Sequence, residues 1–142
     1  MAFRTIIDEV HEELARHGHP DVRPMHGFVF QAVGPHGTTA ADLGRTLGVS
    51  KQAAGKTLTN LEQLGYVSIG RDPHDARRKL VRLTPRGVEC LVLSAHAFEN
   101  VRARWSAELG TERLRALDDD LRRMTPADFF RLDVPGWFGS AS

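Results

Sequence analysis

Three consecutive cations, Arg77, Arg78 and Lys79, carry the densest positive charge of the sequence. They follow Asp72-Pro73 and precede an alternating run at residues 80–83, so they are expected at the tip of a hairpin. Guanidinium and ammonium groups bind phosphates through charge-assisted hydrogen bonds. The pattern therefore favours a finger that binds a polyanion. A solvated basic loop is the alternative.

The charge of the whole chain is distributed unevenly. The 142 residues have a net charge of only +1. Residues 45–86, however, hold nine Lys and Arg against three Asp and Glu, whereas residues 1–44 hold three against six. A basic middle behind an acidic start indicates a local anion-binding face that the total conceals.

A second group of hydrogen-bonding side chains begins at Ser50, which is well suited to cap a helix. Gln52 has the donor and acceptor that match an adenine edge in the major groove of DNA. Lys51 and Lys56 can bind guanine or a phosphate. This helix is therefore a candidate reader of bases.

Three further positions of the same helix have two interpretations each. Thr57 and Asn60 can bond phosphates at the edge of a groove, or can form a solvated face. Gly55 costs about 1 kcal/mol relative to alanine inside a helix. Its presence indicates a close approach, either of DNA or of the preceding helix.

The elements around these residues have a specific order. Thr39 can cap a short helix that ends near Gly48, and the helix that follows it ends at Gly65. Short strands are predicted at residues 66–69 and 80–83. A helix-turn-helix followed by a hairpin is the arrangement of a winged helix. The predicted fold class is therefore mainly α with a small β-hairpin wing.

Helices are also predicted on both sides of this unit, at residues 3–17, 24–33 and 84–109, and from a cap at Thr111 onward. They divide the chain into N-terminal support and dimerisation helices at 1–34, a DNA-binding region at 35–84 and a dimerisation region with a tail at 85–142. Apolar residues on these helices are the predicted subunit interface: Phe3, Ile7, Val10, Leu14, Phe98, Leu114, Leu117 and Leu121. A single larger monomeric core is the alternative.

Residues 20–124 resemble the MarR family of bacterial winged-helix regulators. The resemblance lies in "ADLGRTLGVSKQAAGKTLTNLEQLGYV" and in "RDPHDARRKLVRLTPRG", which looks like the wing pattern of that family. It implies a homodimer that binds a palindromic operator on double-stranded DNA and is often released by a small ligand.

The resemblance also implies roles for single residues. Arg77 matches the wing arginine that enters the minor groove, and Asp75 matches the acid that holds the wing in shape. The start of the recognition helix is matched by Ser50, Lys51, Gln52, Ala53, Gly55 and Lys56. The sequence departs from the family pattern at Ala53-Ala54-Gly55, which leaves fewer hydroxyls for DNA contacts.

The remaining wing cations are expected to support Arg77. Arg78 and Lys79 are predicted to bind flanking phosphates, and Arg71 and Arg82 are secondary anchors.

A small-molecule effector, aromatic in character, is predicted to bind near the second helix. The candidate pocket residues are Met25, His26, Phe28, Phe30 and Trp105. Histidines at positions 11, 17, 19 and 26 leave a metal site open, but no pair has clean i, i+4 spacing on one helix. Cys90 is interpreted as a small buried hydrophobe. With neither a reactive thiol nor a clean histidine pair, no cofactor and no metal are expected.

Other function classes find little support in the sequence. Acidic residues interrupt the N-terminal apolar run, and no segment approaches the length of a membrane span. A single cysteine fits a reducing cytoplasm. No nucleophile elbow, phosphate-binding glycine loop or zinc-protease motif is present, so an enzyme is not expected. The prediction is a cytoplasmic repressor. A winged-helix protein-interaction module and a metal- or thiol-responsive regulator are the alternatives.

Overall fold

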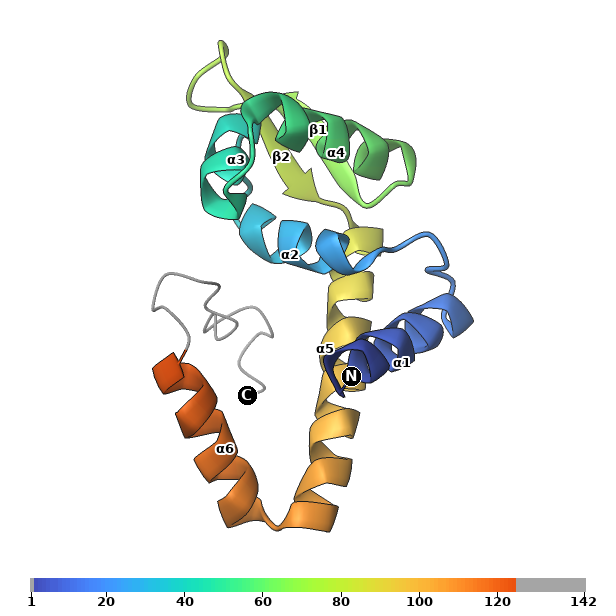
Figure 1. Cartoon of the computed structure of the whole chain (residues 1–142). Coiled ribbons are helices and arrows are strands. Elements are labelled where there is room, and N and C mark those ends of the chain that lie inside the picture. The colour runs from blue at the N-terminus through green and yellow to red at the C-terminus, as the bar shows by residue number, and fades with distance from the viewer. Residues whose placement is uncertain (1, 125–142) are drawn as a thin grey trace, which may run out of the picture.

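Six helices and one two-stranded sheet make up residues 2–124, the part of the chain that the computed structural model describes, with side chains from residue 4 onward (Figure 1). In chain order they are α1 (Ala2–Arg16), α2 (Pro24–Val33), α3 (Ala40–Leu47), α4 (Lys51–Gln63), β1 (Val67–Arg71), β2 (Lys79–Leu83), α5 (Pro85–Leu109) and α6 (Thr111–Met124). This order confirms the predicted winged helix. The predicted tail lies outside the described residues.

Local capping chemistry sets the bounds of α3 and α4. The Thr39 hydroxyl accepts a hydrogen bond from the Asp42 backbone N–H at 3.1 Å, and the Ser50 hydroxyl accepts one from Ala53 at 3.1 Å. Between the helices, Gly48 has a φ of 69°. A Cβ at Gly44 would lie 2.8 Å from the Val49 carbonyl oxygen, so this glycine lets the turn fold tightly against α3.

The wing is an antiparallel ladder that runs from the pair Val67–Leu83 to the pair Arg71–Lys79. Both strands extend closer to the tip than the sequence predicted, because the backbone pairing continues through polar residues that carry no apolar pattern. Thr38, before α3, adds a further pairing with Val81. The N–H of Val81 donates to the Thr38 carbonyl at 2.7 Å. The loop before α3 and the wing are therefore held together.

The long α5 begins as predicted, with the Thr84 hydroxyl accepting from the Gly87 N–H at 3.1 Å. It leads away from the wing, and α6 returns beside it to form a V (Figure 1). Thr111, predicted as a cap, is instead the first residue of α6. The guanidinium of Arg102 makes two hydrogen bonds to the Asp118 carboxylate, at 3.0 and 2.6 Å, and braces the V.

Part of the apolar face of α1, which was predicted to form the subunit interface, is buried within this subunit. Val10 is 3% exposed and Leu14 is 1% exposed, because α1 packs on α5 of the same chain. Ile7 is half-buried, and the side chain of Phe3 lies outside the described part of the chain. The core of this subunit therefore already covers two of the four residues predicted on this face.

The C-terminal helices divide their apolar residues differently. Leu114 of α6 is buried, as are Cys90 and Leu91 of α5. Large apolar side chains nevertheless remain exposed on both helices: Val88, Phe98, Leu109, Leu117, Leu121 and Met124. An exposed apolar surface of this kind is typical of a protein interface.

Candidate nucleic-acid interface

Helix α4 separates a buried face from a polar one. Ala54, Leu58 and Leu61 are at most 2% exposed and anchor the helix to the core. On the outer side, the side chains of Lys51 and Gln52 are exposed and have no hydrogen bond or ion pair with any residue that the structure describes. Their polar groups are therefore available to a partner.

The other predicted α4 residues have different surroundings. Ala53 and Lys56 are exposed, whereas the hydroxyl of Ser50 is engaged as the helix cap. Lys56, Thr57 and Asn60 line a hollow of about 580 Å³ on the flank of the helix, together with residues 20–23. Asn60 is exposed in the third turn, and the other exposed candidates lie in the first two turns of α4 or at its cap.

The structure excludes one of the two interpretations of Gly55. A Cβ added to this residue would meet nothing within 4 Å, so no neighbouring helix requires a glycine here. The close helix–helix packing that the sequence left open is therefore not its reason. A close approach of a partner to this open surface stays a prediction.

The tip of the wing is shaped by two aspartates. Asp72 accepts a hydrogen bond from the His74 backbone N–H at 2.9 Å, and Asp75 accepts one from the Arg77 N–H at 3.0 Å. The Arg78 N–H donates to the Asp75 carbonyl at 3.0 Å and closes the turn. This turn fixes the backbone at Arg77, whose exposed guanidinium has no partner within the described part of the chain.

Arg78 differs from Arg77 because it is tied back to α3. Its Nη2 lies 3.3 Å from Oδ2 of Asp42, a carboxylate that also pairs with Arg45 and accepts from the Thr39 hydroxyl. The Thr39 hydrogen bond and the two guanidiniums lower the pKa of Asp42 below its ordinary value. No local pattern in the sequence indicates this link between α3 and the wing, which joins residues 36 positions apart.

The other wing cations frame the tip. Arg71 and Lys79 occupy facing positions at the last pair of the ladder, and both are exposed. Arg82 lies further down β2 and is also exposed. The cations of the wing thus extend from its base to its tip, with the Arg77 guanidinium as the one at the tip that the fold leaves unpaired among the described residues.

The predicted effector pocket is only partly assembled in one subunit. His26 is buried, lines the hollow beside α4 and lies 6.5 Å from the ring of Phe30. Phe30 is a core residue, Met25 is 54% exposed, and Phe28 and Trp105 are half-buried. None of these four lines the hollow. A pocket that gathers all five residues stays a prediction.

Neither a metal site nor a membrane-spanning helix is found among the described residues. No group of three or more His, Cys, Asp or Glu side chains within residues 2–124 is placed to hold a metal ion. Across the same part of the chain, no helix is both long and apolar enough to cross a membrane.

Known proteins resemble this chain in sequence over part of its length. Residues 21–78 match a model of the MarR family. The uncharacterized HTH-type transcriptional regulator YdgJ of Bacillus subtilis (strain 168) is 36% identical over 84 residues, which is 59% of this chain and 51% of that protein. The chain thus matches about half the length of this curated relative.

Solved structures share the fold over a larger part of the chain. FabT of Streptococcus pneumoniae, in complex with DNA, has a TM-score of 0.71 at 20% identity and covers 87% of each chain. A mutant of MepR from S. aureus, bound to an oligodeoxyribonucleotide, has a TM-score of 0.64 at 20% identity, over 87% of this chain and 90% of that one. YusO of Bacillus subtilis has a TM-score of 0.68 at 19% identity, over 87% and 86%.

The family match falls on the part of the chain that carries the candidate interface. Residues 21–78 include α2, α3, α4, β1 and the wing tip, and the fold of the solved structures continues over the long helices. Sequence match and architecture agree: residues 21–78 are similar to the MarR family, and the chain shares the fold of these solved structures.

Proposed function

We propose that this protein is a DNA-binding transcriptional regulator that uses α4 and the wing as its DNA-contacting surface. The observation that carries the proposal is the set of unpaired polar groups on two rigid elements, Lys51 and Gln52 on α4 and Arg77 on the wing. Figure 1 shows α4 and the wing tip at the same end of the molecule, opposite the turn between α5 and α6. Two of the similar structures are complexes with DNA, which supports the same partner here.

The geometry suits a division of labour between grooves. A major groove accepts one α-helix, so α4 would enter it with Gln52 and Lys51 toward base edges. Arg77 would enter the adjacent minor groove, where a narrow A·T-rich segment has enhanced negative potential. Arg71, Arg78 and Lys79 would contact phosphates around it. Arg78 would contact a phosphate while it stays paired with Asp42. It would therefore hold the wing against α3 and bind DNA at the same time.

We further propose that the regulator is a homodimer that binds an inverted-repeat operator. The exposed apolar side chains of Phe98, Leu117 and Met124 would be covered by a second copy of the chain. A two-fold axis then places the two α4 helices about 34 Å apart, one turn of DNA. The divisions 1–34, 35–84 and 85–142 follow this proposal as support, DNA-binding and dimerisation regions.

The proposed biological action is repression in the cytoplasm. An operator-bound dimer blocks access of the transcription machinery to the promoter. A small, aromatic effector would release it by binding better to an arrangement in which the two α4 helices no longer match the operator spacing.

The test begins with selection of bound duplexes from a random library. Binding to the selected site is then measured by fluorescence anisotropy over a salt series. We expect Arg77→Ala to weaken binding by on the order of 1–3 kcal/mol. It should also reduce the slope of log affinity against log salt concentration by about one. The reason is the loss of one unpaired guanidinium from the wing tip.

Arg16→Ala is the matched control. Arg16 is an exposed arginine at the end of α1 that pairs only with the neighbouring Glu13 among the described residues. It should leave both the affinity and the salt dependence unchanged. If the two substitutions had equal effects, Arg77 would not be a residue that contacts DNA. A wild-type protein that binds no duplex at low salt would contradict the proposed function and favour a protein-interaction module.

A further inference from the structure

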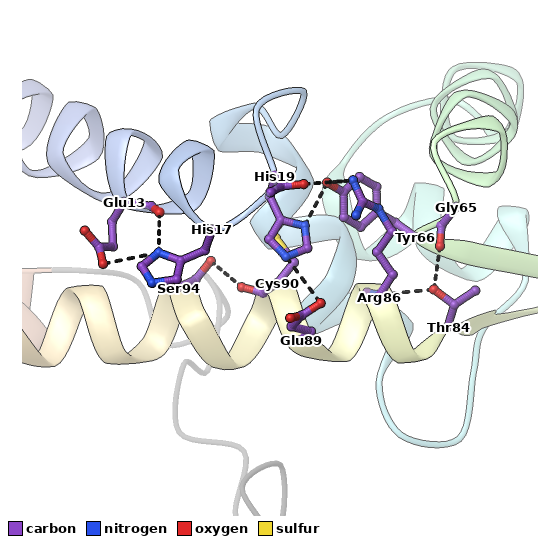
Figure 2. Close-up of polar contacts among 12 residues, drawn as sticks. Glu13, His17, His19, Gly65, Tyr66, Thr84, Arg86, Glu89, Cys90 and Ser94 are labelled. Carbon is purple, nitrogen blue, oxygen red and sulfur yellow. Dashed lines mark hydrogen bonds and ion pairs between the residues drawn. The ribbon is translucent and has the colours of Figure 1, made fainter.

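A group of polar side chains, two of them buried, joins three helix ends away from the DNA-contacting surface. His19, which follows α1, and Tyr66, which follows α4, are 1% and 0% exposed. Their polar atoms meet, with Nδ1 of His19 lying 3.0 Å from the Tyr66 hydroxyl (Figure 2). Arg86, in the first turn of α5, donates to the same hydroxyl at 3.2 Å and lies over the Tyr66 ring at 4.7 Å.

The two helix ends that meet here have the same backbone geometry. In α1, the N–H groups of Gly18 and His19 donate to the carbonyls of Ala15 and Leu14. In α4, those of Gly65 and Tyr66 donate to Glu62 and Leu61. Both patterns are Schellman motifs, with a left-handed glycine followed by a residue that folds back on its helix. This turn directs His19 and Tyr66 inward.

The start of α5 caps both motifs. Nη2 of Arg86 donates to the Gly18 carbonyl at 3.0 Å, and the Thr84 hydroxyl donates to the Gly65 carbonyl at 2.6 Å. The ends of α1 and α4 are thus hydrogen-bonded to one turn of α5 as well as to each other. These hydrogen bonds fix the angle between α4 and α5. That angle matters because α4 would carry the base-reading residues.

The Tyr66 hydroxyl is fully satisfied when His19 is uncharged. A hydroxyl has one proton to donate. With Arg86 donating to the Tyr66 oxygen, an unprotonated Nδ1 of His19 accepts the Tyr66 proton. The remaining ring proton is then on Nε2, which is buried, has no hydrogen-bond partner within the described part of the chain and lies 3.6 Å from Oε2 of Glu89.

Protonation of His19 is incompatible with this arrangement. A charged imidazole donates from both nitrogens, so His19 and Arg86 would both donate to one buried hydroxyl whose own proton has no acceptor. Burial, and then the positive charge of Arg86, lower the pKa of His19 below its ordinary value of 6.5. Glu89 acts in the opposite direction, but its side chain is 62% exposed and the lowering prevails.

The charged and titratable groups around His19 and Tyr66 come from three places: Arg86, Glu89 and Cys90 from α5, His17 from the segment after α1, and Asp21 from the loop before α2. We propose that the His19–Tyr66–Arg86 contacts form a positioning joint that fixes α4 relative to α5 and opens when His19 takes up a proton. Its consequence for DNA rests on the proposed function. The joint itself does not.

The first experiment tests the joint without DNA. Backbone hydrogen exchange of residues 61–67 in the full chain is compared at about pH 7.5 and about pH 5, on either side of the ordinary histidine pKa, with correction for intrinsic exchange. We expect protection to fall by about threefold to tenfold at the lower pH, because a group whose pKa is lower in the folded than in the unfolded chain destabilises the fold when it takes up a proton. His19→Gln retains an acceptor for Tyr66 and does not titrate, so its protection should not fall.

His26→Gln is the matched control. Burial also lowers the pKa of His26, but this side chain lies in α2 and bonds to the Arg23 N–H. Its substitution should leave the fall in protection intact. A fall that persists in His19→Gln, or that is absent from the wild type, would overturn the joint.

The second experiment tests positioning. Affinity is measured for the selected operator and for the same operator with one base pair inserted between its halves. We expect the wild type to prefer the original spacing near neutral pH and to lose most of that preference in acid. Tyr66→Phe keeps the ring and removes the hydroxyl, so it should lose the preference at both pH values, whereas a residue that only stabilises the fold would weaken both duplexes alike.

The two experiments separate the two proposals. Acid-dependent protection in a protein that binds no duplex would support the joint and contradict the proposed function. Normal operator binding together with pH-independent protection and an unchanged spacing preference in Tyr66→Phe would retain the proposed function and overturn the joint.

Discussion

Gly55 leaves a gap in the side-chain surface of α4 between Gln52 and Lys56. Glycine is unfavourable at such a position because it loses more conformational freedom than other residues when a helix forms. The open space around it shows that this subunit does not require the gap. A partner whose surface must approach the helix backbone would require it.

Gly55→Ala should therefore separate stability from binding. We expect the free energy of unfolding to rise by about 0.5–1 kcal/mol in urea denaturation, through the better helix propensity of alanine. Affinity for the selected operator should fall by about tenfold, the equivalent of about 1.4 kcal/mol. Unchanged affinity in the stabilised variant would show that DNA does not approach α4 at this residue.

At the scale of elements, the end of α4 and the start of α5 are joined by backbone as well as side chains. A Cβ at Gly87 would lie 2.2 Å from the Tyr66 carbonyl oxygen, a separation that requires the two segments to move apart. The Thr84 N–H also donates to that carbonyl, at 3.0 Å. The end of α4 and the start of α5 are thus in direct backbone contact.

Gly87→Ala should accordingly destabilise the protein by about 1–3 kcal/mol, the usual cost of overpacking. The measurement is the urea midpoint followed by circular dichroism. Gly27→Ala is the matched control, because Gly27 lies inside α2 and a Cβ there would meet nothing within 4 Å. A Gly87→Ala variant as stable as the control would mean that α5 tolerates a shift at this contact.

At the scale of the whole molecule, the V of α5 and α6 exposes apolar surface away from the winged helix. Leu117 is 40% exposed and Met124 is 73% exposed, while Leu114 on the same helix is buried. The apolar stripe of α6 is thus covered at its start and open further along. A second copy of the chain is the proposed cover.

Leu117→Glu should weaken dimerisation by at least about tenfold, since a charge would be buried without a partner. Sedimentation velocity over a concentration series measures the effect. Ala116→Glu adds the same charge at a neighbouring exposed position, which points to a different side of α6, and should leave the assembly unchanged. If both variants assemble like the wild type, this part of α6 lies outside the subunit interface.

The sequence by itself determined the features that depend on neighbouring residues. The caps at Thr39, Ser50 and Thr84, the left-handed Gly65 and the order of helices and strands all follow from residue types within about one turn of each other. The exposed cations of the wing and of α4 were also predictable, because charge and strand alternation are properties of the linear sequence.

Only the tertiary structure decided which distant groups meet. Arg78 bonds to Asp42 across 36 residues, His19 to Tyr66 across 47, and Arg86 to Gly18 across 68. Nothing local distinguishes these side chains from solvated ones.

The same limit applies to the apolar stripe of α1. Its period showed that one face is covered but could not show by what, because burial against the same chain and burial against a partner require the same residues. Packing on α5 decided it for Val10 and Leu14.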